Sequence, residues 1–261
     1  MHKGLMSSRR FAPLFWSQFF GALNDNLVKN ALAIMVMFGI AGLETESRAT
    51  LVTLAGVMLI LPFFLFSGLA GQIVDSMDKA TVAKWVKGAE VIAALFALVG
   101  FLVGSVPLLM AVLFLTGSLS TLFGPVKYGI LPDHLRRDEL IAGNALVESG
   151  TFVAILLGTV VGGLLGSPSP WMAGALAVGV AIAAFLATLA MPSAPPRAEN
   201  LRPSANILKS SMALLKDLRR DGTAWGASLA ISWFWAVGAV VISLIPPIVA
   251  EHTGGSQTMA T

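Results

Sequence analysis

The sequence predicts an all-α protein that crosses a lipid bilayer several times. Of its 261 residues, 56% are hydrophobic and 12% are charged, and the mean hydropathy is +0.81. A soluble domain of this length usually carries about 25% charged residues, so a water-soluble fold is not expected. The apolar residues form runs of about 20 or more, the length that an α-helix needs to cross the hydrocarbon core.

Seven apolar runs are long enough to be membrane-spanning helices. The first follows a basic N-terminus, but it is too long for a signal peptide and lacks a small-residue cleavage site, so we expect it to be retained. Five more runs follow after short connections. A polar, proline-containing segment from Pro192 to Asp221 precedes the seventh run, and its second half has the pattern of an amphipathic surface helix. The predicted spans are approximately 12–38, 50–73, 83–105, 107–131, 140–165, 170–191 and 223–249.

The basic residues orient these spans. Of the 17 Lys and Arg residues, fourteen fall on one side of the predicted topology, Arg48 alone falls on the other, and Lys29 and Lys127 lie within spans. The positive-inside rule therefore places the N-terminus and the long connection in the cytoplasm. The fourteen are Lys3, Arg9, Arg10, Lys79, Lys84, Lys87, Arg136, Arg137, Arg197, Arg202, Lys209, Lys216, Arg219 and Arg220.

The first predicted span has a strongly polar centre, in which Asp25 and Lys29 lie among three asparagines. Charged side chains at this depth cost several kcal/mol unless the protein compensates them, and by default they mark a functional site. Asp25 and Lys29 are also four residues apart on one helix face, so mutual neutralisation is the alternative. The three asparagines are Asn24, Asn26 and Asn30.

Later spans contain three more ionisable residues of interest. Lys127 lies about one turn from the cytoplasmic end of the fourth span, where it has a substrate or gating role or extends to the lipid headgroups. Glu148, roughly 13 Å deep in the fifth span, is equally compatible with a substrate contact and with a structural pair to Lys127. Glu90 follows Lys87 by three residues near the end of the third span, and we expect a surface pair there.

The fifth predicted span also carries a packing signal. Gly158, Gly162 and Gly166 recur at every fourth residue. Small residues at this spacing allow the backbone of a second helix to approach closely. We therefore expect this face of the fifth span to pack against another helix.

The connection after the second span carries a motif. From Gly71 to Lys79, a glycine is followed four residues later by Asp75 and then by a basic residue. The segment resembles the cytoplasmic motif that joins the second and third spans of major facilitator transporters, although Ser76 stands where an arginine is usual. The resemblance implies that Asp75 braces a gate by pairing with a helix N-terminus or an arginine. An ordinary solvated loop carboxylate is the alternative.

Three further motifs lie inside the predicted spans. They are Asn24-Asp25-Asn26, the run from Phe123 to Pro132, and Gly143 to Ser149 followed by Ala154 to Gly158. In this order they resemble the bacterial lysophospholipid transporter family of the major facilitator superfamily. The resemblance covers the first six spans and reaches into the seventh.

This resemblance implies a major facilitator-type six-helix bundle plus a seventh span, which is the layout of an incomplete transporter. Residues 1–191 would form the N-terminal bundle, 192–221 the cytoplasmic loop between the halves, and 222–261 the truncated start of the second half. On this resemblance the rest of the second half would be missing, because the chain is a fragment of a longer protein or because it assembles with another chain. Such transporters hold their substrate near the bilayer midplane between the two halves.

The family resemblance also implies a function. It predicts a flippase that moves lysophosphatidylethanolamine-like lipids from the outer to the inner leaflet of the bacterial inner membrane, where they are re-acylated. An acyltransferase and an acyl-activating domain would then be partners or fused domains outside this chain.

A lysophospholipid headgroup carries a phosphate and often an ammonium, so its site needs both charges and additional hydrogen bonds. Asp25 would face the ammonium, and Lys127 or Lys29 would face the phosphate. Glu148 is a further candidate contact. The residues expected to form the remaining hydrogen bonds are Asn24, Asn26, Asn30, Tyr128 and Asn144.

An enzymatic function has little support in the sequence. His134 and Asp138 are one residue too close for an acyltransferase His-x4-Asp motif, and neither a phosphate loop nor a metal-ligand cluster is present. Cysteine is absent. We expect no cofactor, no metal and no nucleic-acid partner. Two other functions stay open: a proton-coupled exporter of another amphiphile or drug, with Asp25 as the coupling carboxylate, and a non-transporting membrane anchor for an acyltransferase.

Overall fold

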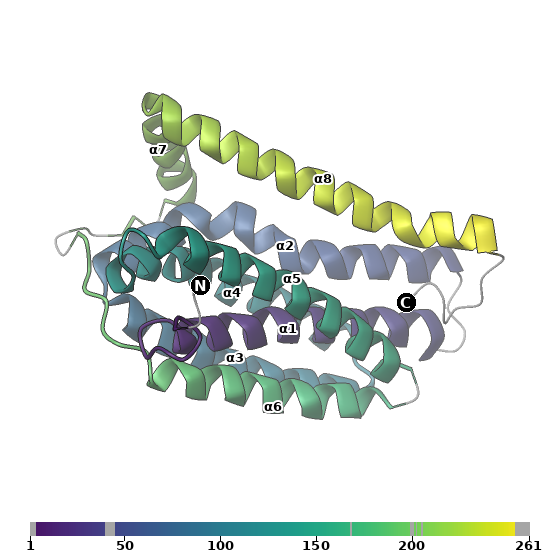
Figure 1. Ribbon diagram of the computed structural model, residues 1–261. Helices are drawn as coiled ribbons and strands as arrows, with labels where there is room; N and C mark the ends of the chain where they lie inside the picture. Colours follow the sequence, from purple (N-terminus) through teal and green to yellow (C-terminus); the bar gives the residue numbers. More distant parts are fainter. Residues whose placement is uncertain are drawn as a thin grey trace. The chain divides into compact units, whose positions relative to one another are not determined.

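The computed structural model describes residues 4–39, 45–167, 169–198, 201, 203–204 and 206–253, and most of these residues are helical (Figure 1). No β-strand occurs within these ranges, which confirms the predicted all-α fold. The chain divides into two compact units, Met1–Ala205 and Asn206–Thr261. Each unit is described by itself below.

In the first unit, one long helix corresponds to each of the first six predicted spans (Figure 1). Several helices extend past the apolar runs, because backbone hydrogen bonding continues into the polar ends. α1 passes directly into a π-helical segment, η1. The bounds are α1 Ala12–Ile34, η1 Met35–Gly39, α2 Thr45–Ser76, α3 Lys79–Val103, α4 Val106–His134, α5 Leu140–Leu165 and α6 Pro170–Leu189.

The second unit contains α7 (Ile207–Arg220) and α8 (Gly222–Thr253). α7 carries its polar and apolar residues on opposite faces and ends in two basic residues, which agrees with the predicted amphipathic helix. The guanidinium of Arg219 lies 5.0 Å from the centre of the Trp225 ring. The placement of α7 on a membrane surface stays a prediction.

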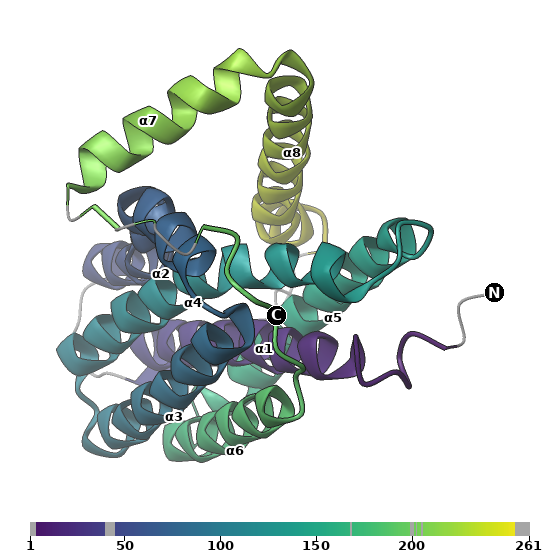
Figure 2. The ribbon, with the colours of Figure 1, turned by 90° about the vertical axis from the view of Figure 1, so that its left-hand side faces the viewer.

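Within the described residues, five helices are long and apolar enough to cross a membrane: α2, α3, α4, α5 and α6. α1 and α8 are not among them. For α1 the polar centre that includes Asp25 and Lys29 explains the difference, because it lowers the hydropathy of an otherwise apolar helix. The position of α1 shields this polar centre from lipid. α1 contacts α4, α5 and α6 and lies between helices when the bundle is viewed end-on (Figure 2).

The glycine pattern of α5 packs against α1, as the spacing predicts. A Cβ atom at Gly158, Gly162 or Gly166 would collide with a backbone carbonyl oxygen of α1. Glycine at these positions therefore lets the two backbones come close enough for extensive van der Waals contact. The three carbonyl groups belong to Leu23, Leu27 and Ala31.

The core of the bundle consists of two hydrophobic clusters. One includes Phe15 and Val86, and the other includes Leu27 and Ala94. Along both α1 and α3, polar side chains occupy the residues between the two clusters. We call this region the polar layer; its members on α1 and α3 are Gln18, Asn24, Asp25, Lys87 and Glu90.

Candidate functional site

Asp25 contributes a partly buried carboxylate to the polar layer. Its Oδ2 accepts a hydrogen bond of 2.6 Å from the Ser120 hydroxyl of α4. Glu90, Lys87 and Lys29 lie within electrostatic range of Asp25. The sequence therefore identified the residue on which charges from α1 and α3 and a hydroxyl from α4 converge.

Lys29 does not form a direct ion pair with Asp25, although their spacing allows one. Its Nζ instead donates a hydrogen bond of 3.2 Å to Oδ1 of Asn26. The ammonium is partly buried and has a neutral partner. Lys29 therefore interacts with Asp25 through space but forms no ion pair with it.

The three asparagines of α1 differ in their surroundings. Asn26 donates to the carbonyl of Ala22 at 2.9 Å, and Asn30 donates to the carbonyl of Asn26 at 2.8 Å and to Thr159 Oγ1 at 3.2 Å. These amide groups are occupied within the bundle. Asn24 is buried, and its Oδ1 accepts no hydrogen bond among the described residues.

Lys127, Tyr128 and Glu148 come together between α4 and α5. Lys127 Nζ lies 3.9 Å from Glu148 Oε1 and 4.5 Å from the centre of the Tyr128 ring, and the Tyr128 hydroxyl donates a hydrogen bond to Glu148. The Lys127 side chain is 14% exposed and that of Glu148 is 33% exposed. A structural pair, one of the two alternatives for Glu148, is therefore present, and it lies where a ligand has partial access.

Lys87 and Glu90 correct the sequence analysis. They form the expected pair, with Lys87 Nζ 2.7 Å from Glu90 Oε1, but their side chains are 2% and 1% exposed rather than at the surface. A signal was available: Ala83, Ala94 and Ala97 share their helical face and are fully buried or nearly so. A stripe of small residues on α3 thus marked its packed side.

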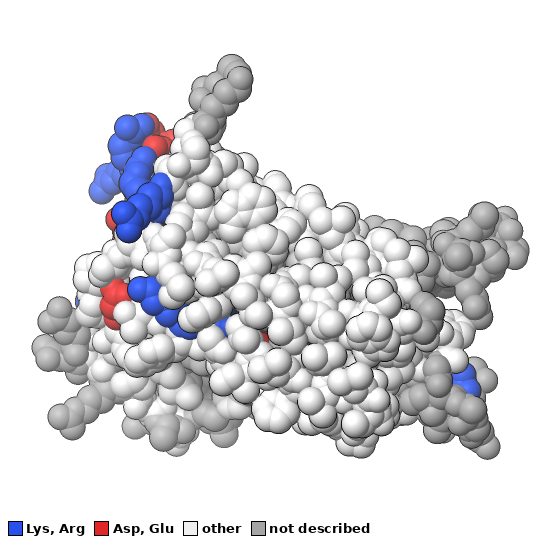
Figure 3. All heavy atoms as spheres, turned by 90° about the horizontal axis from the view of Figure 1, so that it is seen from below, with Lys and Arg blue, Asp and Glu red and all other residues white. Residues whose placement is uncertain are grey.

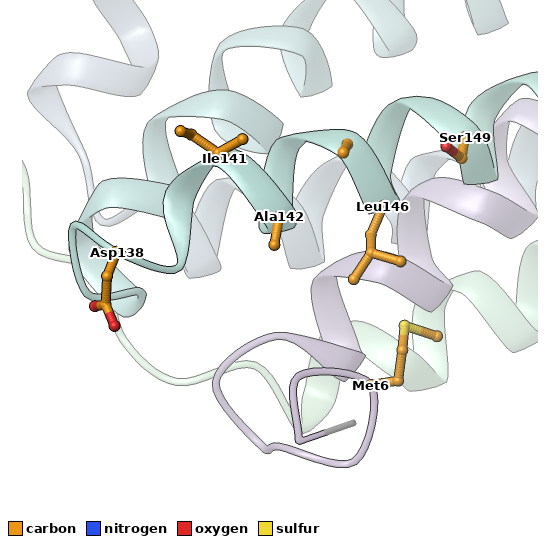
Figure 4. Close-up of a pocket in the computed structure, with 7 residues that line it drawn as sticks. Met6, Asp138, Ile141, Ala142, Leu146 and Ser149 are labelled. Carbon is orange, nitrogen blue, oxygen red and sulfur yellow. The ribbon is translucent and has the colours of Figure 1, made fainter. Parts of the chain in front are cut away.

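Asn144 lies apart from the polar layer. It is exposed and donates a hydrogen bond of 2.8 Å to the carbonyl of Leu140 in its own helix. A separate open hollow borders the same helix, and Ile141, Ala142 and Leu146 line it together with Met6 (Figure 4). This hollow is mainly apolar and contains none of the predicted site residues.

At the end of the bundle where α2 meets α3, Asp78 rather than Asp75 caps a helix. Asp78 accepts hydrogen bonds from Thr81 N at 2.8 Å, Ser193 Oγ at 2.6 Å and Ala194 N at 2.8 Å. Burial raises the pKa of Asp78, but the hydrogen bonds from Ser193, Thr81 and Ala194 outweigh burial and hold the pKa below its usual value. The Asp75 side chain is exposed. The gating role of Asp75 stays a prediction.

A chain of ion pairs joins the same end of the bundle. Lys79 Nζ and Arg197 Nη2 both contact the Asp133 carboxylate, at 2.9 Å and 3.1 Å, and Arg10 pairs with Glu139 at 3.2 Å. Elsewhere on the face drawn in Figure 3 most of the surface is free of Lys, Arg, Asp and Glu. Charge is thus concentrated at the helix ends, as a bilayer requires.

Long apolar helices around a buried polar layer define a multi-pass membrane protein that holds charged groups inside the bilayer. Residues 14–261 match the family described as the Major Facilitator Superfamily, and the chain belongs to this superfamily.

Curated relatives agree with the resemblance seen in the motifs. The chain is 28% identical to the Lysophospholipid transporter LplT of Pectobacterium carotovorum over 97% of its length, and 28% identical to that of Citrobacter koseri over 93%. A third relative with this name, from Enterobacter sp. (strain 638), is 29% identical over 70% of the chain. The alignments cover 60%, 57% and 45% of these relatives, so the chain spans at most about three fifths of their length.

We predict that Asp78→Ala lowers the thermal stability of the purified protein, because it removes a helix cap and the acceptor for Ser193 and Ala194. Loss of such a cap costs about 1–2 kcal/mol. The wild-type contribution should be present above the ordinary aspartate pKa of about 3.9 and should be lost as the pH falls below it, since the folded pKa is depressed. Thermal melts at several pH values measure this.

Asp75→Ala is the matched control for this measurement. Its carboxylate belongs to the same connection but is exposed, so the change in stability should stay within about 0.5 kcal/mol. Equal destabilisation by the two substitutions would contradict the assignment of the cap to Asp78.

A second prediction concerns the pair between α4 and α5. Lys127→Ala and Glu148→Gln should each reduce membrane abundance, because each leaves one poorly solvated charge unpaired. The double variant should recover abundance, since no unpaired charge remains. Immunoblots of membranes measure abundance, and the exposed Arg136–Asp138 pair, neutralised in the same way, should have no effect. A double variant no more abundant than the worse single variant would rule out structural coupling.

Proposed function

We propose that this chain forms part of a lysophospholipid transporter. The observation that carries the proposal is that the Asp25 carboxylate of the polar layer and the Lys29 ammonium, one helical turn further along α1, lie partly buried without forming an ion pair with each other. A zwitterionic headgroup supplies a positive and a negative charge and thus complements such a site. The names of the curated relatives agree with this chemistry.

In this proposal the Asp25 carboxylate binds the lipid ammonium, with Ser120 orienting it. Lys29 or Lys127 binds the phosphate. If Lys127 binds it, the phosphate would replace Glu148 as the partner of the ammonium, since the Lys127–Glu148 contact is long and partly accessible to a ligand. Asn24 has a free buried carbonyl oxygen for a further hydrogen bond. The contacts proposed for Asn26, Asn30, Tyr128 and Asn144 require these side chains to exchange their present partners.

The family resemblance also supports a proposed direction of transport. Lysophosphatidylethanolamine-like lipids would move from the outer to the inner leaflet of the bacterial inner membrane, and an acyltransferase with an acyl-activating partner would consume them. Residues 1–191 would form the first half of the transporter, 192–221 the loop between the halves and 222–261 the start of the second half. The other half would supply the opposite wall of the substrate site.

Asp25→Asn tests the proposal. The isosteric amide removes the charge that would bind the ammonium, so uptake of labelled lysophosphatidylethanolamine into spheroplasts by the full-length gene product should fall at least tenfold at unchanged membrane abundance. Asp138→Asn, at a carboxylate whose side chain is 70% exposed, is the control and should transport normally. Normal uptake by Asp25→Asn would remove Asp25 from the site.

The proposed orientation has its own test. Residues 1–261 contain no cysteine, so a single cysteine introduced into this chain is labelled without background from it. A cysteine at Glu46 should react with a membrane-impermeant maleimide added from outside, and one at Arg197 should react only after permeabilisation. The reverse pattern would invert the topology.

A further inference from the structure

The pair formed by Lys87 and Glu90 is the most deeply buried pair of opposite charges among the described residues. Lys87 Nζ donates to both carboxylate oxygens of Glu90, at 2.7 Å and 2.9 Å, and lies 4.0 Å from the centre of the Phe123 ring on α4. Burying two charges is costly even when they are paired, and well-packed apolar residues often stabilise a protein at least as well. Stability alone therefore gives a weak reason for this pair.

The position of the pair connects it to the proposed substrate site. On α1, a Cβ atom at Gly21 would collide with Lys87 Nζ, so the absence of a side chain there admits the ammonium between the helices. Asp25 lies one helical turn further along α1, within electrostatic range of both Lys87 and Glu90. The pair is thus seated directly against the segment that carries the Asp25 carboxylate.

Burial limits what the pair does. With side chains 2% and 1% exposed, Lys87 and Glu90 cannot touch a substrate in this conformation. Their charges nevertheless act through a poorly screened interior, where the effective dielectric constant is far below that of water. An electrostatic influence on the headgroup is the contribution open to them.

We propose that the Lys87–Glu90 pair is a specificity-determining element, whose balanced charges set which headgroup charge the Asp25 site accepts. The inference rests on the proposed lysophospholipid transport. It goes beyond that proposal by assigning Lys87 and Glu90, which do not touch the substrate, an electrostatic effect on the Asp25 site. The other charges that face this region are Asp25 itself, Lys29 and the Lys127–Glu148 pair. Since the charges of Lys87 and Glu90 cancel, the net charge of the site is set by these partly buried groups.

The two single neutralisations should shift selectivity in opposite directions. Lys87→Met leaves Glu90 unbalanced, so the site becomes more negative and should favour lysophosphatidylethanolamine, which carries an ammonium, over anionic lysophosphatidylglycerol. Glu90→Gln leaves Lys87 unbalanced and should favour lysophosphatidylglycerol. One unit charge within about two helical turns of the bound headgroup should change the ratio of lysophosphatidylethanolamine uptake to lysophosphatidylglycerol uptake roughly tenfold. The double variant should return to the wild-type ratio.

The experiment uses the full-length gene product in spheroplasts, supplied with an equimolar mixture of the two labelled lipids. The ratio of the two uptakes is measured within one sample, so a change in membrane abundance does not affect it. A purely structural role would reduce both uptakes together, whereas an electrostatic role separates them. Lys84→Met, which removes a lysine one turn closer to the end of α3, is the matched control and should keep the wild-type ratio.

A further variant guards against misfolding of the single neutralisations. Lys87→His keeps a charged partner for Glu90 at pH 5.5 and loses it at pH 8, so its uptake ratio should become more pH-dependent than that of the wild type. If the wild type transports neither lipid, the proposed function fails and this inference fails with it. If the wild type transports but the single variants shift the ratio in the same direction or not at all, and Lys87→His follows the wild-type pH profile, this inference alone is overturned.

Discussion

The constraint on which this structure depends is the cost of placing charge in a bilayer. Lys87 is buried, and its pairing with Glu90 and its contact with the Phe123 ring compensate the lost solvation with groups from α3 and α4. On α1, Gly21 lies at the point of contact, and a Cβ atom there would force the Lys87 ammonium to shift. The polar layer therefore fixes how three helices meet, in addition to carrying the candidate site.

The position of α1 follows from the same constraint. A helix with Asp25 and Lys29 near its centre is unfavourable beside lipid, and α1 instead contacts α4, α5 and α6. The glycines of α5 strengthen this arrangement, since they allow its backbone to reach the carbonyl groups of α1. Dispersion contacts between closely spaced backbones can drive such packing, because lipid provides little hydrophobic force between helices.

Sequence patterns predicted the helices well because hydropathy depends on length and composition, which are properties of each segment alone. They also drew attention to Asp25, on which hydrogen-bonding and charged groups of other helices converge, and offered the Lys127–Glu148 contact as one of two alternatives. The burial of Lys87 and Glu90 was missed because a charge near the end of a span has the same hydropathy whichever way its helix faces. Only the packed side of α3, marked by Ala83 and Ala94, separates the two outcomes. For Asp75, the motif identified the correct connection, but the helix N-terminus belongs to Asp78 three residues later.

The Lys87–Glu90 and Lys127–Glu148 pairs differ in burial and spacing, and these differences suit different roles in the proposed transporter. Lys87 and Glu90 lie 2.7 Å apart and are almost fully enclosed, so separating them would leave two buried charges without solvent. Lys127 and Glu148 lie 3.9 Å apart, and their side chains are 14% and 33% exposed, so a ligand phosphate is able to replace Glu148 at a much smaller desolvation cost. In the proposed transporter, the enclosed pair would act on the site through its charges, and the more exposed pair would open to receive the substrate. The enclosed pair packs against α1 at Gly21, and the more exposed pair lies between α4 and α5. The roles proposed for the two lysines therefore differ because of burial rather than residue type.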